Sequence, residues 1–224
     1  MAALVDMFFH MSSDPNAPIV VYISHSDEDD LLSLRCEIYS HHVSEYAMIS
    51  KNTVNWNVQL SPWKADQIGK GVGPFAGQAD TFIKSLEVEI SQTIIDCKLN
   101  PSAVYIVGYS LAGLFALYAL YKTDIFDGAA CCSGSLWYPE FTSFVEENEF
   151  KRKPSKLYLS LGDQESKVKN PVFATVEDKT KEVYEFYKAQ DINVYFEMNP
   201  GNHMADVDKR VAKGIAHLLK ETET

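Results

Sequence analysis

The chain has 224 residues, of which 46% are hydrophobic, enough to bury one sizeable core. Asp and Glu outnumber Lys and Arg by 31 to 20, so the net charge of −11 argues against nucleic acid or an anionic membrane as the main partner. We therefore expect a single domain over residues 1–224 that binds neither nucleic acid nor membrane.

The cysteines and the first residues indicate where the protein works. The chain has four cysteines, Cys36, Cys97, Cys131 and Cys132. None forms a C-x-x-C motif, and the adjacent pair would point to opposite faces of a strand, so reduced thiols are expected. The N-terminal apolar patch contains Asp6 and His10 and follows no basic segment, so we expect no signal peptide. These features predict a cytoplasmic protein.

The first third of the chain predicts few regular elements. A β-branched run, Ile19–Ser24, predicts a strand, and residues 31–44 are compatible with a helix or a loop. A short apolar segment, residues 46–50, indicates another strand. Residues 52–65 are rich in asparagine and predict a loop that holds Trp56. Four glycines and a proline in residues 69–77 predict a surface loop.

From residue 80 onward, helical and strand patterns alternate. Helices are predicted over 80–97, from 111 for three turns, over 140–150, over 172–187 and over 206–220. Strands are predicted over 103–107, 128–132, 156–161 and 193–198. This alternation predicts an α/β fold with a mostly parallel central sheet that helices cover on both faces.

A candidate nucleophile lies where the first of these later strands meets its helix. The sequence G-Y-S-L-A-G places Ser110 between the predicted strand and the helix that starts at Leu111. Gly108, Ala112 and Gly113 are small, as this sharp turn requires, because it brings strand and helix into contact. The usual motif is G-x-S-x-G, so Ala112 is a departure that a small side chain can accommodate.

Two further strand ends complete a candidate catalytic triad. The strand at 156–161 is followed by Asp163 and Glu165, and the last strand by His203. The order nucleophile, acid, histidine is that of the α/β-hydrolases. Histidine can take the proton of a serine hydroxyl and return it to the leaving group, while a carboxylate orients the imidazole. We therefore expect Ser110 as the nucleophile and His203 as the base.

The identity of the acid stays open between two carboxylates. Glu165 lies three residues after Gly162, the glycine that ends the strand, which is a frequent position for the acid in such hydrolases. Asp163 is the first residue after that glycine and is suited to bonding backbone amides of the turn. Aspartate is nevertheless the commoner residue in this role. We favour Glu165 and keep Asp163 as the alternative.

Four segments resemble a known family: GYSLAGLFALYAL, SGSLWYPEF, LSLGDQE and PGNHM. They are similar to the α/β-hydrolase esterase group that includes enterochelin-type siderophore esterases, S-formylglutathione hydrolase, feruloyl esterases and mycolyl transferases. The resemblance covers residues 56–219. It implies a serine esterase that hydrolyses a small-molecule carboxylic ester without cofactor or metal. The alternatives are acyl transfer by the same triad and a catalytically inactive hydrolase fold that only binds; the oligomeric state is not readable from the sequence.

The remaining site residues follow from loop order. The backbone N–H of Leu111, which follows the nucleophile, is expected to form one half of an oxyanion hole. The other half is expected near Asn55 or Trp56. We expect Trp137, together with Trp56 and Tyr109, to wall the substrate pocket.

Overall fold

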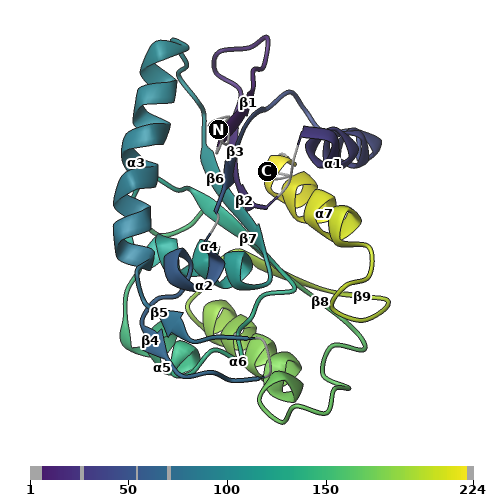
Figure 1. Ribbon diagram of the computed structural model, residues 1–224. Helices are drawn as coiled ribbons and strands as arrows, with labels where there is room; N and C mark the ends of the chain where they lie inside the picture. The colour runs from purple at the N-terminus through teal and green to yellow at the C-terminus, as the bar shows by residue number, and fades with distance from the viewer. Residues whose placement is uncertain (1–6, 26–27, 54, 70–71, 221–224) are drawn as a thin grey trace, which may run out of the picture.

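The structure, a computed structural model, describes residues 7–25, 28–53, 55–69 and 72–220. In this part of the chain, seven strands form one sheet in the order β1-β3-β2-β6-β7-β8-β9 (Figure 1). They are β1 (Met7–His10), β2 (Ile19–Ser24), β3 (Ala47–Asn52), β6 (Val104–Tyr109), β7 (Gly128–Cys132), β8 (Lys156–Gly162) and β9 (Val194–Asn199). β1 pairs antiparallel with β3, and the other described pairs in this sheet are parallel.

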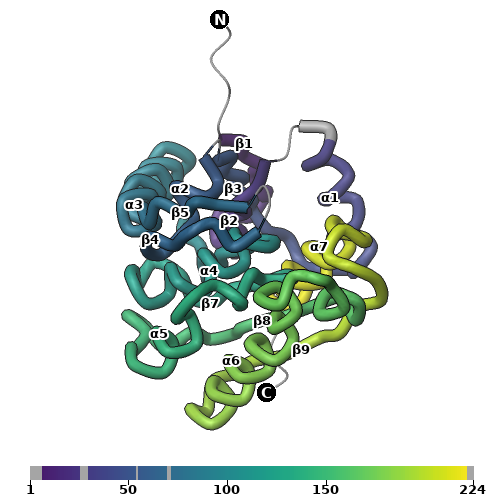
Figure 2. Tube along the Cα trace, turned by 60° about the horizontal axis from the view of Figure 1, so that its bottom comes forward, coloured from purple at the N-terminus to yellow at the C-terminus, as the bar shows by residue number. Residues whose placement is uncertain are grey.

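Helices cover both faces of the sheet, as the alternating pattern predicts. The main helices are α1 (Glu28–Ser40), α3 (Ala79–Asp96), α4 (Leu111–Lys122), α5 (Phe141–Glu147), α6 (Val176–Ala189) and α7 (Val207–Leu219). α1 and α7 pack on one face and α3, α4 and α6 on the other (Figures 1 and 2). Alternate residues of β2 therefore enter two cores: Val21 packs with α3 and α4, and Val20 packs with α1 and α7.

Strand β6 and helix α4 are in close contact at their junction. Residues 111–121 are all buried, so α4 lies inside the molecule rather than on its surface. A Cβ atom on Gly108 would lie 2.2 Å from the carbonyl oxygen of Ala112. Glycine is therefore needed at position 108, because the helix backbone contacts the strand there.

Two sequence-based expectations near the N-terminal half need correction. Residues 52–65 contain a short helix, α2 (Trp56–Gln59), and the strand β4 (Lys64–Ala65). Residues 69–77 are not simply a surface loop, because β5 (Phe75–Ala76) pairs with β4 and Phe75 is buried. The Phe75 ring packs on Tyr138 with ring centroids 5.0 Å apart. That contact joins segments far apart in the sequence, which local patterns do not reveal.

The edge strand β1 was not predicted, and residues 28–40, for which the sequence left helix or loop open in part, form a helix. The four residues of β1 are too short for a periodic pattern and depend on pairing with β3. α1 replaces the undecided helix or loop at residues 31–44. No helix among the described residues is long and apolar enough to cross a membrane.

Candidate active site

Three parallel strands deliver the candidate residues to one edge of the sheet. β6, β7, β8 and β9 are neighbours in that order and run in the same direction, so their carboxyl ends lie together. Ser110 directly follows β6, Glu165 lies just beyond β8, and His203 lies just beyond β9. Ligands bind at this edge in open parallel sheets.

Ser110 occupies a strained turn at the N-terminus of α4. Its backbone φ is 59° and ψ is −123°, an unusual conformation for a residue other than glycine. The Ser110 carbonyl accepts hydrogen bonds from the N–H groups of Gly113 at 3.0 Å and Leu114 at 3.2 Å. The backbone therefore fixes the side chain at the tip of the turn, as a nucleophile elbow requires.

A continuous chain of hydrogen bonds joins Ser110, His203 and Glu165. His203 Nε2 lies 3.0 Å from Ser110 Oγ, and His203 Nδ1 lies 2.7 Å from Glu165 Oε2. Because an ionised carboxylate only accepts, Nδ1 carries the proton and Nε2 is free to accept the serine proton. Glu165 is nearly inaccessible, with 3% of its side chain exposed, whereas His203 is 38% exposed and can reach a substrate.

The environment of Glu165 keeps its carboxyl group ionised. Burial raises the pKa of Glu165, but its hydrogen bond and charge interaction with His203 and the N–H of Gly162 outweigh burial. The pKa of the group is therefore held below its usual value. Oε1 accepts from Gly162 N at 2.6 Å and from Arg210 Nη1 at 2.9 Å. Each carboxylate oxygen thus has its own donors, which fixes the plane of the group.

Asp163, the alternative acid, makes different contacts. Its Oδ1 accepts a hydrogen bond from the backbone N–H of Gly201 at 2.9 Å, and the side chain is exposed. That bond lowers the pKa of Asp163. Asp163 therefore ties the turn after β8 to the turn after β9, while Glu165 contacts the imidazole.

The predicted oxyanion donors differ in how well they are placed. The backbone N–H of Leu111 is at the start of α4, before the first intrahelical bonds, and so points out of the helix end. Asn55 N donates to Gln59 Oε1 at 3.3 Å, and the Trp56 ring stacks on His25 with centroids 4.2 Å apart. Since β2 lies between β3 and β6, the end of β2 is nearer to β6 in the sheet than the end of β3 is. The assignment of Asn55 or Trp56 stays a prediction.

Two cavities meet at Ser110 and His203. The first has a volume of about 230 Å³ and is mainly apolar, lined by Val72, Ser110, Ser135, Trp137, Glu165, Val168, Phe173, Val176 and His203. The second is wider, about 550 Å³, and is lined by Tyr22, Ile23, Ser24, His25, Asp30, Trp56, Tyr109, Ser110, His203, Met204, Val207 and Asp208. Trp137 therefore lies in the first cavity, and Tyr109 and Trp56 lie in the second. An ester carbonyl at Ser110 could extend one substituent into each.

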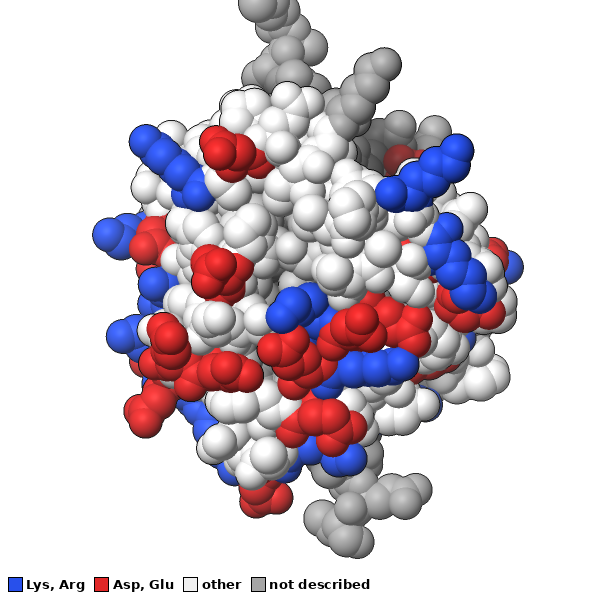
Figure 3. Space-filling view, turned by 90° about the horizontal axis from the view of Figure 1, so that it is seen from below, with Lys and Arg blue, Asp and Glu red and all other residues white. Residues whose placement is uncertain are grey.

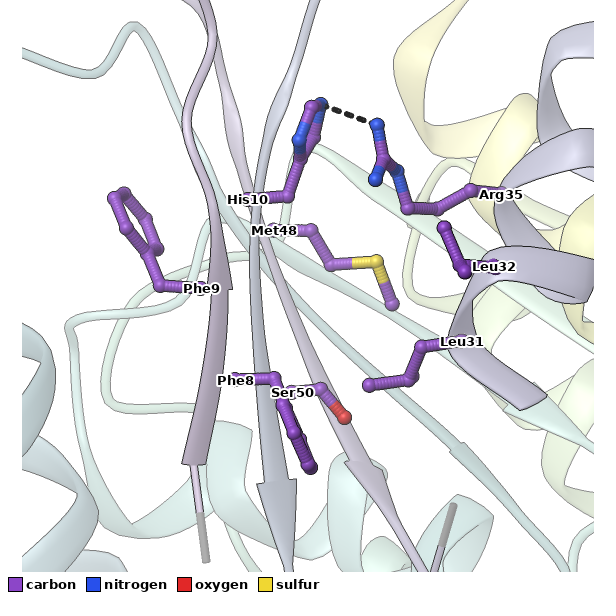
Figure 4. Close-up of a pocket in the computed structure, with 8 residues that line it drawn as sticks. All are labelled: Phe8, Phe9, His10, Leu31, Leu32, Arg35, Met48 and Ser50. Carbon is purple, nitrogen blue, oxygen red and sulfur yellow. Dashed lines mark hydrogen bonds between the residues drawn. The ribbon is translucent and has the colours of Figure 1, made fainter. Parts of the chain in front are cut away.

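A third cavity, between β1, β3 and α1, has a histidine but a different chemistry (Figure 4). His10 Nε2 lies 3.2 Å from Arg35 Nη2, and none of the described residues that line this space of about 130 Å³ is a carboxylate. Burial and the neighbouring guanidinium both lower the pKa of His10. A histidine paired with a cation lacks the orienting carboxylate that a catalytic base needs.

Acidic side chains do not form a single patch on the face of the molecule seen from below. Figure 3 views the molecule from below Figure 1, the direction toward which the parallel strands run. Acidic and basic side chains are interleaved in a band across the lower half of this face, and the centre of its upper half is mostly uncharged.

Among the described residues, no group of three or more His, Cys, Asp or Glu side chains could hold a metal ion.

Sequence reasoning missed two polar residues beside the triad. Ser135 Oγ lies 3.3 Å from Ser110 Oγ, and the Ser135 N–H donates to the Ser110 carbonyl at 3.0 Å. Arg210, on α7, is 1% exposed and contacts Glu165. The signal for Arg210 was present, since it lies between Val207 and Val211 on the apolar stripe of the helix, where a charge needs a partner.

Comparisons with known proteins give the fold. No protein-family model matches the chain. The uncharacterised protein YbbA of Bacillus subtilis (strain 168) is 21% identical over 184 residues, which cover 79% of this chain and 74% of that protein. An IroE-like serine hydrolase from Shewanella oneidensis superposes with a TM-score of 0.78 at 16% identity, covering 95% of this chain and 75% of that one. The siderophore hydrolase EstA from Aspergillus nidulans gives 0.70 at 19% identity, covering 92% and 84%.

At such low identity the likeness is informative about the fold. The mostly parallel sheet with helices on both faces and its resemblance to these hydrolases confirm the predicted α/β-hydrolase fold. The similar structures are themselves named serine and siderophore hydrolases, the kind of protein that the sequence motifs resemble.

Proposed function

We propose that this protein is a serine esterase that hydrolyses small-molecule carboxylic esters through an acyl-enzyme on Ser110. The observation that carries the proposal is the unbroken hydrogen-bond path from Ser110 Oγ through His203 to Glu165. Serine hydroxyls are poor nucleophiles without such a base, and isolated Ser–His contacts lack the carboxylate that sets the tautomer.

In the first half of the reaction, Ser110 Oγ attacks the ester carbonyl carbon while His203 Nε2 takes the hydroxyl proton. The carbonyl oxygen becomes an oxyanion, which the backbone N–H of Leu111 stabilises in this proposal. The tetrahedral intermediate collapses when the C–O bond to the alcohol breaks and His203 returns the proton to the departing oxygen. Glu165 stays ionised and balances the transient positive charge on the imidazole.

In the second half, water replaces the alcohol. His203 removes a proton from the water as its oxygen attacks the acyl carbon, and the same proton returns to Ser110 Oγ when the carboxylic acid leaves. An acceptor alcohol could take the place of water, which would make the enzyme an acyltransferase. The wide cavity beside His203 is the feature that favours this second candidate.

The two cavities limit the substrate. The apolar cavity that holds Trp137 and Phe173 fits an uncharged aliphatic or aromatic substituent on one side of the ester. The wide cavity fits a larger group on the other side. The likeness to a siderophore hydrolase supports a small-molecule substrate.

The proposal also includes the cellular location and the domain organisation of the protein. The four cysteines are free thiols, which supports a reducing, cytoplasmic location. We further propose a single hydrolase domain over residues 1–224 that needs no cofactor.

A fluorophosphonate probe and a panel of nitrophenyl esters test the proposal together. Ser110→Ala should abolish labelling and ester hydrolysis, and Ser155→Ala is a matched control. Ser155 Oγ donates to the carbonyl of Asp127, before the amino end of β8 and away from the active-site edge. If the folded Ser110→Ala protein kept most of the hydrolysis, the esterase assignment would be wrong. Ester turnover that rises with added alcohol would instead favour acyl transfer.

A further inference from the structure

The guanidinium group of Arg210 connects the candidate acid to the turn that carries His203. Nη1 lies 2.9 Å from Glu165 Oε1. Nη2 donates to the carbonyl oxygens of Pro200 at 2.9 Å and Asn202 at 3.0 Å. A single buried side chain therefore holds both the carboxylate and the backbone that immediately precedes the histidine.

Arg210 also reaches the two neighbouring strand ends. Nη1 lies 3.2 Å from the hydroxyl of Tyr109, which ends β6, and 3.0 Å from Ser133 Oγ, which follows β7. The Tyr109 hydroxyl donates in turn to the carbonyl oxygen of His203 at 2.7 Å. The histidine backbone is thus held directly on one side and through Tyr109 on the other.

The end of β8 is shaped around this guanidinium. A Cβ atom on Gly162 would lie 2.7 Å from Arg210 Nη2, 2.9 Å from Nη1 and 2.3 Å from the carbonyl oxygen of Gly201. Glycine at position 162 leaves the room that Arg210 needs beside Glu165. An apolar side chain could fill the volume of Arg210, but it could not bond the surrounding oxygens.

We infer that Arg210 is a positioning residue for the catalytic triad, an inference that rests on the proposed function. By bonding Glu165 Oε1 it leaves Oε2 for His203 Nδ1. By bonding the carbonyls before His203 it fixes the imidazole at hydrogen-bond distance from Ser110. Arg210 touches neither the nucleophile nor the substrate cavities, so it acts through Glu165 and His203.

Because Arg210 is charged, a positioning role predicts a change in the pH dependence of the rate, which a purely structural role does not. The guanidinium bonds the other oxygen of the carboxylate that His203 Nδ1 contacts, and its positive charge opposes a positive charge on the imidazole. Loss of the guanidinium charge should therefore shift the acid limb of the rate profile to higher pH. The other titratable groups around His203 remain in both Arg210 variants: Tyr109 on β6, His25 after β2, Asp30 on α1, Asp163 after β8 and Asp208 on α7.

The experiment compares Arg210→Gln and Arg210→Lys in the full chain. Each variant is assayed for kcat and KM on a nitrophenyl ester and for the rate of labelling by a fluorophosphonate, across the pH range in which histidine titrates. We expect Arg210→Gln to lower kcat about 10²-fold with KM little changed, since misplacement of the base affects the chemical step. Its acid limb should move to higher pH. Arg210→Lys keeps the positive charge but loses the planar guanidinium. Its acid limb should therefore lie at the wild-type pH, and its kcat should lie between those of Arg210→Gln and wild type.

Lys156→Gln is the matched control. Lys156 is also a buried cation that bonds backbone carbonyls, but it lies at the opposite end of β8 and donates to Leu218. This variant should lower the melting temperature and leave the activity per folded molecule and the acid limb unchanged. If Arg210→Gln behaved in the same way, Arg210 would be only structural and the inference would be wrong.

Two further outcomes keep the test decisive. If Arg210→Gln does not fold, Arg210→Lys carries the test, because lysine lacks the planar guanidinium that bonds Glu165 and two backbone carbonyls together; a wild-type kcat and labelling rate in Arg210→Lys would overturn the inference. Ser110→Ala separates the two proposals, because retained hydrolysis there refutes the esterase itself. Lost hydrolysis in Ser110→Ala with normal Arg210 variants refutes only the role of Arg210.

Discussion

Replacing Glu165 by glutamine should impair catalysis through the histidine tautomer. In the wild-type protein Oε1 accepts from Gly162 N and from Arg210 Nη1, while Oε2 accepts from His203 Nδ1. The amide oxygen of glutamine must stay where the two donors converge, because an NH₂ group there would face Gly162 N–H and the guanidinium. The NH₂ group then faces Nδ1 of His203 and forces that nitrogen to accept.

The size of the effect follows from that reversal. With Nδ1 as the acceptor, the proton moves to Nε2, which can no longer take the proton of Ser110 3.0 Å away. Loss of the correct tautomer costs about 10⁴-fold in kcat in a comparable serine triad. Breaking a buried ion pair can cost about 3–5 kcal/mol of stability. We expect less here, because glutamine still accepts a hydrogen bond from Arg210.

The assay measures kcat per folded molecule for Glu165→Gln and for Asp163→Asn as its matched control. Asparagine at position 163 can still accept the Gly201 N–H through its side-chain oxygen. Its kcat should stay within a few-fold of wild type, and its melting temperature should fall only slightly. A large loss of kcat in Asp163→Asn with near-normal Glu165→Gln would refute the tautomer argument and assign the acid to Asp163. Near-normal activity in both would reduce the site to a Ser110–His203 dyad.

Three further predictions concern stability and specificity. The pKa of Glu165 is lowered from 4.5, so its ionised form stabilises the fold above that pH, and this stabilisation is lost as the pH falls through the folded-state pKa. Urea unfolding at falling pH should therefore show a smaller loss of stability for Glu165→Gln than for wild type. Equal losses of stability would contradict an ionised, buried Glu165. Gly162→Ala should cost about 1–3 kcal/mol in urea unfolding and lower kcat, because its Cβ would lie 2.3 Å from the Gly201 oxygen and crowd Arg210; wild-type values for both would refute the tight fit. Trp137→Ala should enlarge the apolar cavity and shift kcat/KM toward esters with bulkier substituents, whereas lower stability with unchanged KM and kcat would make Trp137 a core residue only.

Local sequence determined which segments form the strands and the helix that carry the site. The β-branched run before Gly108 and the helix formers after Ser110 specify strand and helix by their own propensities, and small residues at the junction permit the contact between them. The alternation of such segments restricts the sheet to parallel pairing, so the carboxyl ends of β6, β8 and β9 had to share an edge. Ser110 and His203 could therefore be proposed from chain order alone.

Tertiary structure decided what depends on distant segments. Asp163 and Glu165 are two residues apart after the same strand, so local pattern leaves either able to reach His203. The turn after β9 engages Asp163 through Gly201, and Arg210 on α7 holds Glu165 against the imidazole. The same reason explains why β1 and the buried Phe75 escaped prediction: both depend on partners far along the chain. Backbone propensity acts between near neighbours, whereas the choice between two adjacent carboxylates is made by packing and hydrogen bonds that exist only once the chain has folded.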